Sequence, residues 1–331
     1  APGPEDWQDR MDLRQLPLVT IDGETAKDFD DAVYVERQEN GYRLLVAIAD
    51  VAHYVPEGSA LDLEARDRGN SYYFPLSVEP MFPEALSNGL CSLRPHLPRL
   101  AMVVDTPYSL DGRPGSPRLY SAVIRSAARL TYTQVQQALD GDPDQTTRPL
   151  LPMLEQAREL ALLFMQLRAE RGCLDFDIPE AAVTLDQGVV RVGTTTRLFS
   201  HRLIEEFMIA ANERVAEYLG GRQRVFPYRI HPQPDERKLE GLLGMLAHTA
   251  VADRLPRTTD QAGLQQLSRA VHGTDLEYLV NRLILRTMMQ AQYSPDNDGH
   301  YGLASEAYCH FTSPIRRYAD LLVHRSLKRL V

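Results

Sequence analysis

Four aspartates within ten residues restrict the fold of this chain more than any other feature. Asp22 follows the strand-like residues 18–21, and Asp28, Asp30 and Asp31 lead into a second strand-like run. Carboxylates this close repel one another and favour the unfolded chain unless something compensates them. A hard divalent cation such as Mg²⁺ would do so, because it prefers carboxylate, water and phosphate oxygens as ligands. The cluster therefore predicts metal-assisted chemistry on a phosphate ester.

The acidic cluster has two other interpretations, a solvated loop and a Ca²⁺ loop. Phe29 and the apolar runs on either side disfavour a solvated loop, and the spacing does not match the D-x-[DN]-x-[DN]-G pattern of a Ca²⁺ loop. Asp30 and Asp31 are adjacent, so in extended backbone at most one of them shares a side with Asp28. Two metals, or one metal plus a base or hydrogen-bonding role, would use all four.

Composition narrows the class of protein. The 331 residues are 44% hydrophobic and 24% charged, which is typical of a soluble globular chain. No secretory signal and no apolar run of ~18 residues is present, and three widely separated cysteines favour a reducing compartment. The net charge of −9 argues against a nucleic-acid partner, yet from Thr312 onward five basic residues accompany one acid. We expect a cytoplasmic monomer with no membrane contact.

Hydrophobic periodicity predicts a mixed α/β fold. Hairpins are expected at residues 31–37 with 42–49, 100–108 with 119–126, and 182–185 with 189–192, because turn-forming residues separate each pair of runs. Helices are expected at residues 151–171, 202–219, 235–247 and 276–292. Residues 1–15 resemble a linker, and residues 16–331 read as one large domain with a mostly antiparallel sheet surrounded by helices.

The segment from Thr312 to Asp320 is the second candidate constellation. Thr312, Ser313 and Pro314 predict the start of a helix, whose free N–H groups and positive dipole form an anion site. Arginines in the first turn of a helix are unfavourable unless an anion such as phosphate is present. An ordinary capped helix with arginines facing solvent is the alternative.

Aromatic and acidic side chains elsewhere extend the hypothesis of a nucleic-acid substrate. Tyr73, Tyr132 and Phe176 lie at predicted element boundaries, where bases could stack on their rings, although core packing is the commoner role. Glu205 lies early in a helix, where it could stabilise the N-terminus or accept a hydrogen bond from a ribose 2′-OH. The sequence contains no zinc motif, Walker A loop, G-x-G-x-x-G or G-x-S-x-G.

Six blocks in order resemble the catalytic (RNB) domain of the RNase II / RNase R exoribonucleases. They are residues 21–32 (IDGETAKDFDDA), 46–50 (VAIAD), 69–75 (GNSYYFP), 81–93 (MFPEALSNGLCSL), 204–212 (IEEFMIAAN) and 310–318 (HFTSPIRRY). The resemblance implies a 3′→5′ hydrolytic exoribonuclease that requires Mg²⁺ or Mn²⁺ and releases nucleoside 5′-monophosphates from single-stranded RNA.

The resemblance also implies a role for each candidate residue. Asp22, Asp28, Asp30 and Asp31 resemble the metal-binding and catalytic acids, with Asp30 the most critical, and Arg316 resembles the arginine at the scissile phosphate. Tyr73 and Phe176 resemble a clamp on the terminal bases, Tyr132 a residue affecting product length, and Glu205 the reader of ribose.

The sequence departs from the family in one respect. Full-length members carry cold-shock-like and S1 domains of the OB type beside the catalytic domain, and these residues match neither, which argues against tight RNA binding by them alone. An inactive RNA-binding relative and a two-metal phosphodiesterase acting on DNA are the alternatives to an active exoribonuclease.

Overall fold

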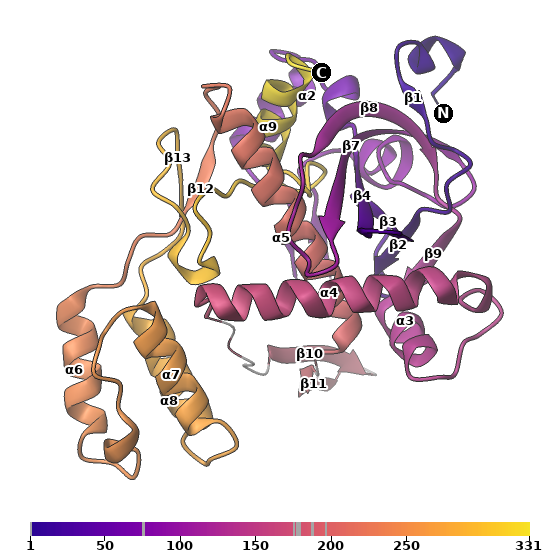
Figure 1. The fold of residues 1–331 in the computed structure, drawn as a ribbon. Coiled ribbons are helices and arrows are strands. Elements are labelled where there is room, and N and C mark those ends of the chain that lie inside the picture. The colour runs from indigo at the N-terminus through magenta and orange to yellow at the C-terminus, as the bar shows by residue number, and fades with distance from the viewer. Residues whose placement is uncertain (1, 75–76, 175, 177–179, 187–188, 196) are drawn as a thin grey trace.

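A seven-stranded mixed sheet forms the centre of the fold (Figure 1). The computed structural model describes residues 2–74, 77–174, 176, 180–186, 189–195 and 197–331. Four of the six neighbouring strand pairs are antiparallel, and the two outermost pairs, β1 with β8 and β2 with β9, are parallel. The strands in spatial order are β1 (Met11–Asp12), β8 (Arg118–Arg125), β7 (Pro98–Ser109), β4 (Gly41–Ala49), β3 (Asp31–Gln38), β2 (Val19–Asp22) and β9 (Ala128–Thr131).

Both faces of this sheet are buried. Along β4, Leu44 and Val46 face one hydrophobic core while Leu45 and Ala47 face another, as the two-residue period of a strand requires. The first core includes residues of α3, α4 and α5, and the second includes residues of α1 and α2. The α-helices of the described chain are α1 (Val51–Tyr54), α2 (Ala60–Arg68), α3 (Tyr132–Leu139), α4 (Leu151–Arg171), α5 (Phe199–Gly220), α6 (Glu236–Leu246), α7 (Gln261–Val271), α8 (Glu277–Thr287) and α9 (Tyr318–Lys328).

The predicted fold class is confirmed, as are all three hairpins. β3–β4, β7–β8 and β10–β11 (Glu180–Asp186 and Val189–Thr195) pair antiparallel at the expected positions. The helix over 151–171 has the predicted bounds, and α5 and α6 differ from prediction by a few residues. The helix predicted over 276–292 ends at Thr287. Beyond it, His231 contacts the Met289 carbonyl, and residues 292–294 form β13 against β12 (Tyr228–Ile230).

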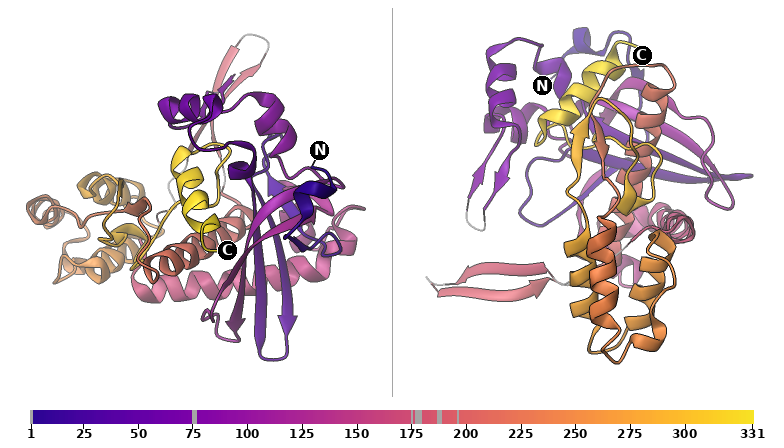
Figure 2. Two further views of the ribbon diagram at one scale, coloured as in Figure 1. Left: turned by 90° about the horizontal axis from the view of Figure 1, so that it is seen from above. Right: turned by 90° about the vertical axis from the view of Figure 1, so that its left-hand side faces the viewer.

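Helices α6–α8 form a separate unit with its own hydrophobic core. The short ribbon of β12 and β13 connects this unit with the main body, and the β10–β11 hairpin projects away from the sheet (Figure 2). None of the described helices is both long and apolar enough to cross a lipid bilayer.

The N-terminal segment, predicted to resemble a linker, contacts the main body. Met11 and Asp12 form β1 in the central sheet, and the Arg10 guanidinium contacts the buried Asp50 carboxylate at 2.7 Å. Lys328 of α9 contacts the same carboxylate at 2.8 Å. The charges of Lys328 and Arg10 hold the pKa of Asp50 below its usual range although burial acts in the opposite direction.

Candidate active site

The four aspartates lie on one irregular segment, the acidic loop (residues 22–31), which joins β2 to β3. Asp22 is the last residue of β2 and Asp31 the first of β3. The two strands pair only at Val19 and Val33, so they separate before the loop begins. The loop therefore crosses the end of the sheet and carries all four carboxylates to one edge.

Hydrogen bonding makes the four carboxylates unequal. Asp28 accepts a hydrogen bond of 2.6 Å from the Tyr73 hydroxyl, and the buried Asp30 accepts one of 2.9 Å from the Ile315 N–H. Asp22 and Asp31 accept none from the other residues that the structure describes. Of the four carboxylates, Asp30 is the one that accepts a hydrogen bond from the segment 285 residues further along the chain.

Burial dominates the electrostatics of the acidic loop. Desolvation raises the pKa of Asp22 above the usual carboxyl range, the charge of Asp31 adds to the effect, and Arg129 opposes it. Burial also raises the pKa of Asp30 and Asp31, against the positive charge of Arg316. Carboxylates in this state gain most from a bound cation, because the cation favours their ionised form.

The residues opposite the acidic loop form the arginine turn (residues 312–317). A helix was predicted to start at Thr312–Pro314, and this prediction is wrong: α9 begins at Tyr318. Arg317 is extended and bridges to Asn70, while the Tyr318 N–H donates to the Gly69 carbonyl. Because this pairing and the Asp30 carboxylate use the backbone of the turn, the turn cannot continue into the helix.

The two arginines of this turn point to different partners. Arg317 donates two hydrogen bonds, of 2.8 and 2.9 Å, to the fully buried Asp320 carboxylate, which also accepts the Ser313 N–H at 2.8 Å. Arg316 is exposed, and its guanidinium donates to the Ser313 hydroxyl at 3.2 Å. Arg317 therefore holds the turn, whereas Arg316 is available to a ligand.

Acidic loop and arginine turn line one cavity of about 530 Å³. Eight of the nine residues selected from the sequence line it: Asp22, Asp28, Asp30, Asp31, Tyr73, Tyr132, Glu205 and Arg316. Six further polar or aromatic residues line it that were not among these nine: His201, Asn212, Tyr308, Thr312, Ser313 and Arg317. Of these, only the three in the arginine turn had a local signal, their position beside Arg316.

Three of the lining side chains have defined orientations. Tyr73 is half exposed at the rim, and Tyr132 stacks on His201 with ring centroids 4.0 Å apart and planes inclined by 25°. Glu205 forms an ion pair with Arg197, whereas the adjacent Glu206 points to the other side of α5 and contacts Arg168 at 2.7 Å. Helix α5 thus presents Glu205, and not Glu206, to this cavity.

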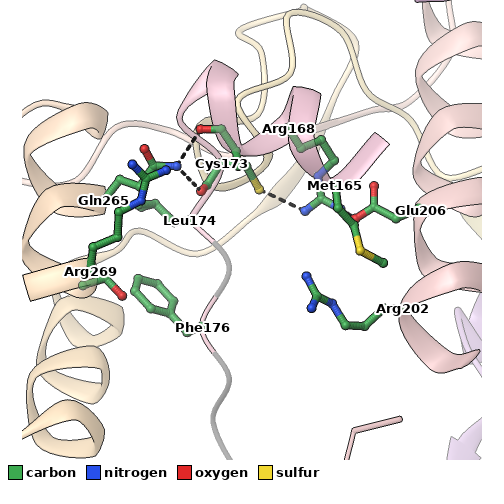
Figure 3. Close-up of a pocket in the computed structure, with 11 residues that line it drawn as sticks. Met165, Arg168, Cys173, Leu174, Phe176, Arg202, Glu206, Gln265 and Arg269 are labelled. Carbon is green, nitrogen blue, oxygen red and sulfur yellow. Dashed lines mark hydrogen bonds and ion pairs between the residues drawn. The ribbon is translucent and has the colours of Figure 1, made fainter. Parts of the chain in front are cut away.

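Phe176 is the one selected residue that lies elsewhere. It lines a second cavity of about 220 Å³, between α7 and the facing sides of α4 and α5. Figure 3 shows its ring near Gln265 and Arg269, across from Arg202 and Glu206. The structure does not bring Phe176 together with Tyr73.

The donor atoms of the acidic loop decide whether it suits a metal ion. Among the described residues, no three carboxylate, histidine or cysteine side chains are grouped so that they alone could hold a metal ion. Mg²⁺, however, usually keeps several waters and binds through one or two carboxylates plus substrate phosphates. Asp22 and Asp31, with burial-raised pKa values and no hydrogen bond from another described residue, fit such a site.

The sequence is similar to known ribonucleases along almost its whole length. The family model described as "RNB domain" matches residues 10–331. Ribonuclease R of Vibrio parahaemolyticus is 44% identical over 97% of this chain and 39% of its own length, and Ribonuclease R of Escherichia coli K12 is 45% identical over 97% and 40%. The chain thus spans about two fifths of the length of these curated relatives.

Solved structures share the fold. RNase R of Mycoplasma genitalium in complex with ribose-methylated single-stranded RNA superposes with a TM-score of 0.94 at 34% identity, over all of this chain and 53% of that one. Yeast Ssd1, a pseudonuclease, has the same fold with a TM-score of 0.80 at 22% identity, over 99% of this chain and 41% of that one. With its sheet, its acidic loop and the match to 322 of its residues, from 10 to 331, this chain belongs to the RNB domain family.

Proposed function

We propose that this chain is the catalytic domain of a Mg²⁺-dependent exoribonuclease that shortens single-stranded RNA from its 3′ end and releases nucleoside 5′-monophosphates. One observation carries the proposal: the Asp30 carboxylate contacts the Ile315 N–H at 2.9 Å, so the acidic loop and Arg316 share one cavity. The similarity to Ribonuclease R supports RNA as the substrate. Mn²⁺ would serve in place of Mg²⁺.

Some residues of the cavity would bind the cation, and others would bind the phosphate. Asp22 and Asp31 would hold the cation, which supplies a Lewis acid and an activated water when bound, and the charges of Asp28 and Asp30 would add to the attraction for it. The exposed guanidinium of Arg316 would bind the non-bridging oxygens of the scissile phosphate and stabilise the charge that develops there. Asp30 fixes the arginine turn relative to the acidic loop through Ile315. A phosphate between the two segments would lie between the carboxylates of the acidic loop and the guanidinium of Arg316.

The remaining lining residues would bind the 3′-terminal nucleotides. The half-exposed ring of Tyr73 offers a stacking surface at the rim, and its hydroxyl is fixed by Asp28. Glu205, which pairs with Arg197, would accept a hydrogen bond from a ribose hydroxyl, a contact that distinguishes RNA from DNA. Phe176 lies outside this cavity and packs against the core of the α6–α8 unit, so its RNA contact stays a prediction.

The state of the cysteines indicates the cellular compartment in which the protein works. Cys91 and Cys309 are buried free thiols. Free thiols are the normal state in a reducing compartment, so we propose a cytoplasmic location.

An inactive relative is the second candidate, because the pseudonuclease Ssd1 shares the fold. The test incubates 5′-labelled single-stranded RNA and DNA of one sequence with Mg²⁺ and compares the wild-type protein with Asp30→Asn. Stepwise shortening of RNA that is lost in the variant is expected. The exposed Asp67, with the same substitution, is the matched control. RNA binding without shortening would identify an inactive relative, and cleavage of DNA would identify a DNA phosphodiesterase.

A further inference from the structure

The acidic loop has no regular secondary structure between Asp22 and Asp31, so a few backbone hydrogen bonds and the side chains that contact it fix its shape. Ser92 fixes the second half of the loop: its hydroxyl donates to the Lys27 carbonyl at 2.7 Å and accepts the Phe29 N–H at 3.1 Å. The first half, next to Asp22, is held by a different residue.

That residue is Arg129 of β9. Its Nη2 donates to the carbonyls of Gly23 at 2.5 Å and Glu24 at 2.9 Å. Its guanidinium carbon also lies 5.6 Å from the centroid of the Phe29 ring, within the range of a cation–π contact. One side chain thus joins both halves of the loop.

The sheet explains how Arg129 reaches the loop. Strand β9 runs parallel to β2, and Arg129 pairs with Thr20, two residues before Asp22. Arg129 therefore lies beside the end of β2, where the acidic loop begins. Thr133, just beyond β9, adds a hydrogen bond of 2.7 Å to the Glu24 carboxylate. The start of the loop is therefore tied to a rigid strand.

The charge of Arg129 is the opposite of what a cation site needs. A guanidinium close to Asp22 repels a cation bound there, so on charge alone its removal should tighten cation binding. Its hydrogen bonds have the reverse effect, because they hold Asp22 and the loop in a fixed position. The two effects predict changes of opposite sign, which makes them separable by experiment.

We propose that Arg129 is a positioning residue that holds the acidic loop in the conformation that receives the divalent cation. The inference rests on the proposed function, since the cation site is part of it. Arg129 acts through the carbonyls of Gly23 and Glu24 and is assigned no contact with RNA or metal. Residues that orient metal ligands from outside typically contribute about 10–100-fold to metal affinity.

The test measures Mn²⁺ affinity from the electron paramagnetic resonance signal of free Mn²⁺, with ribose-methylated single-stranded RNA present to supply the phosphate. Wild type, Arg129→Met and Arg129→Lys are compared, with melting temperatures recorded for each. Arg129→Met should weaken Mn²⁺ binding roughly tenfold or more. Arg129→Lys, which keeps the charge and a donor but loses the guanidinium geometry, should restore part of the affinity.

Arg254→Met is the matched control, because Arg254 also donates to a backbone carbonyl, that of Ala270, but in the α6–α8 unit. It should leave Mn²⁺ affinity unchanged. Unchanged or tighter binding by Arg129→Met would overturn the inference while leaving the proposed function intact. If that variant does not fold, Arg129→Lys decides: a loss of threefold or more supports positioning, and wild-type affinity contradicts it. Absence of Mn²⁺ binding by the wild type would overturn the proposed function and the inference together.

Discussion

The acidic loop and the arginine turn face each other across one cavity, but they are stabilised in opposite ways. In the arginine turn, Asp320 is fully buried and satisfied by the Ser313 N–H and both donors of Arg317. In the acidic loop, Asp22 is partly buried beside other carboxylates and accepts no hydrogen bond from another described residue. One aspartate therefore stabilises the fold, and the other lowers stability in order to be available to a ligand.

The largest expected effect on stability comes from Asp320→Asn. The amide would leave the Arg317 charge without its carboxylate in a mostly buried position, at a cost of about 3 kcal/mol. Urea denaturation measures this change, and Asp67→Asn, at an exposed position, should lie within about 0.5 kcal/mol of wild type. A loss at Asp320 no larger than that at Asp67 would show that the ion pair does not hold the turn.

The same substitution at Asp22 should have the opposite sign. In EDTA, Asp22→Asn removes a carboxylate that burial and the charge of Asp31 disfavour, so stability should rise by about 1.5 kcal/mol. Exonuclease activity should be lost in the same variant. Urea denaturation with and without Mg²⁺ makes the comparison, and the gain should shrink when Mg²⁺ is present. If Asp22→Asn destabilised the protein in EDTA, Asp22 would stabilise the fold as Asp320 does, and the two segments would not differ in this respect.

These differences explain which parts of the site could be predicted from the sequence. The four carboxylates are neighbours in sequence, so their mutual repulsion and the need for a cation follow from local chemistry. The hairpins, and with them the fold class, could be predicted because each hairpin also joins residues that are close in sequence. The bounds of α4 also followed, because its apolar stripe is regular and Gly172 adopts the left-handed conformation that ends it.

The parts that sequence reasoning missed depend on distant contacts. Thr312–Pro314 has the composition of a helix start, but pairing with residues 69–71 keeps the chain extended. Arg129 donates to backbone carbonyls, which every residue has. No sequence motif can therefore identify Gly23 and Glu24 as its partners. That Arg316 opposes the acidic loop came from the family resemblance, because no local pattern connects segments 285 residues apart.

The smallest expected effect concerns His324, which supports the arginine turn from α9. It is fully buried, contacts the Phe311 carbonyl through Nε2 at 2.8 Å and stacks on the Phe311 ring with centroids 4.2 Å apart. Burial lowers its pKa from 6.5 to about 4, although the Phe311 carbonyl and the charges of Asp50 and Asp320 favour the protonated form and Lys328 opposes it.

A folded-state pKa below the unfolded value means that the unfolded chain binds the proton first, so this histidine lowers stability as the pH falls below about 6.5. His324→Gln keeps a hydrogen-bond donor and removes the titration. Between pH 7 and pH 5.5 the wild type should therefore lose about 1 kcal/mol relative to this variant, whatever the variant costs at pH 7. Urea denaturation at both pH values measures the double difference, which cancels the contributions of His300 and His310, whose pKa values burial also lowers. A difference independent of pH would mean that the folded protein does not hold His324 in its neutral form.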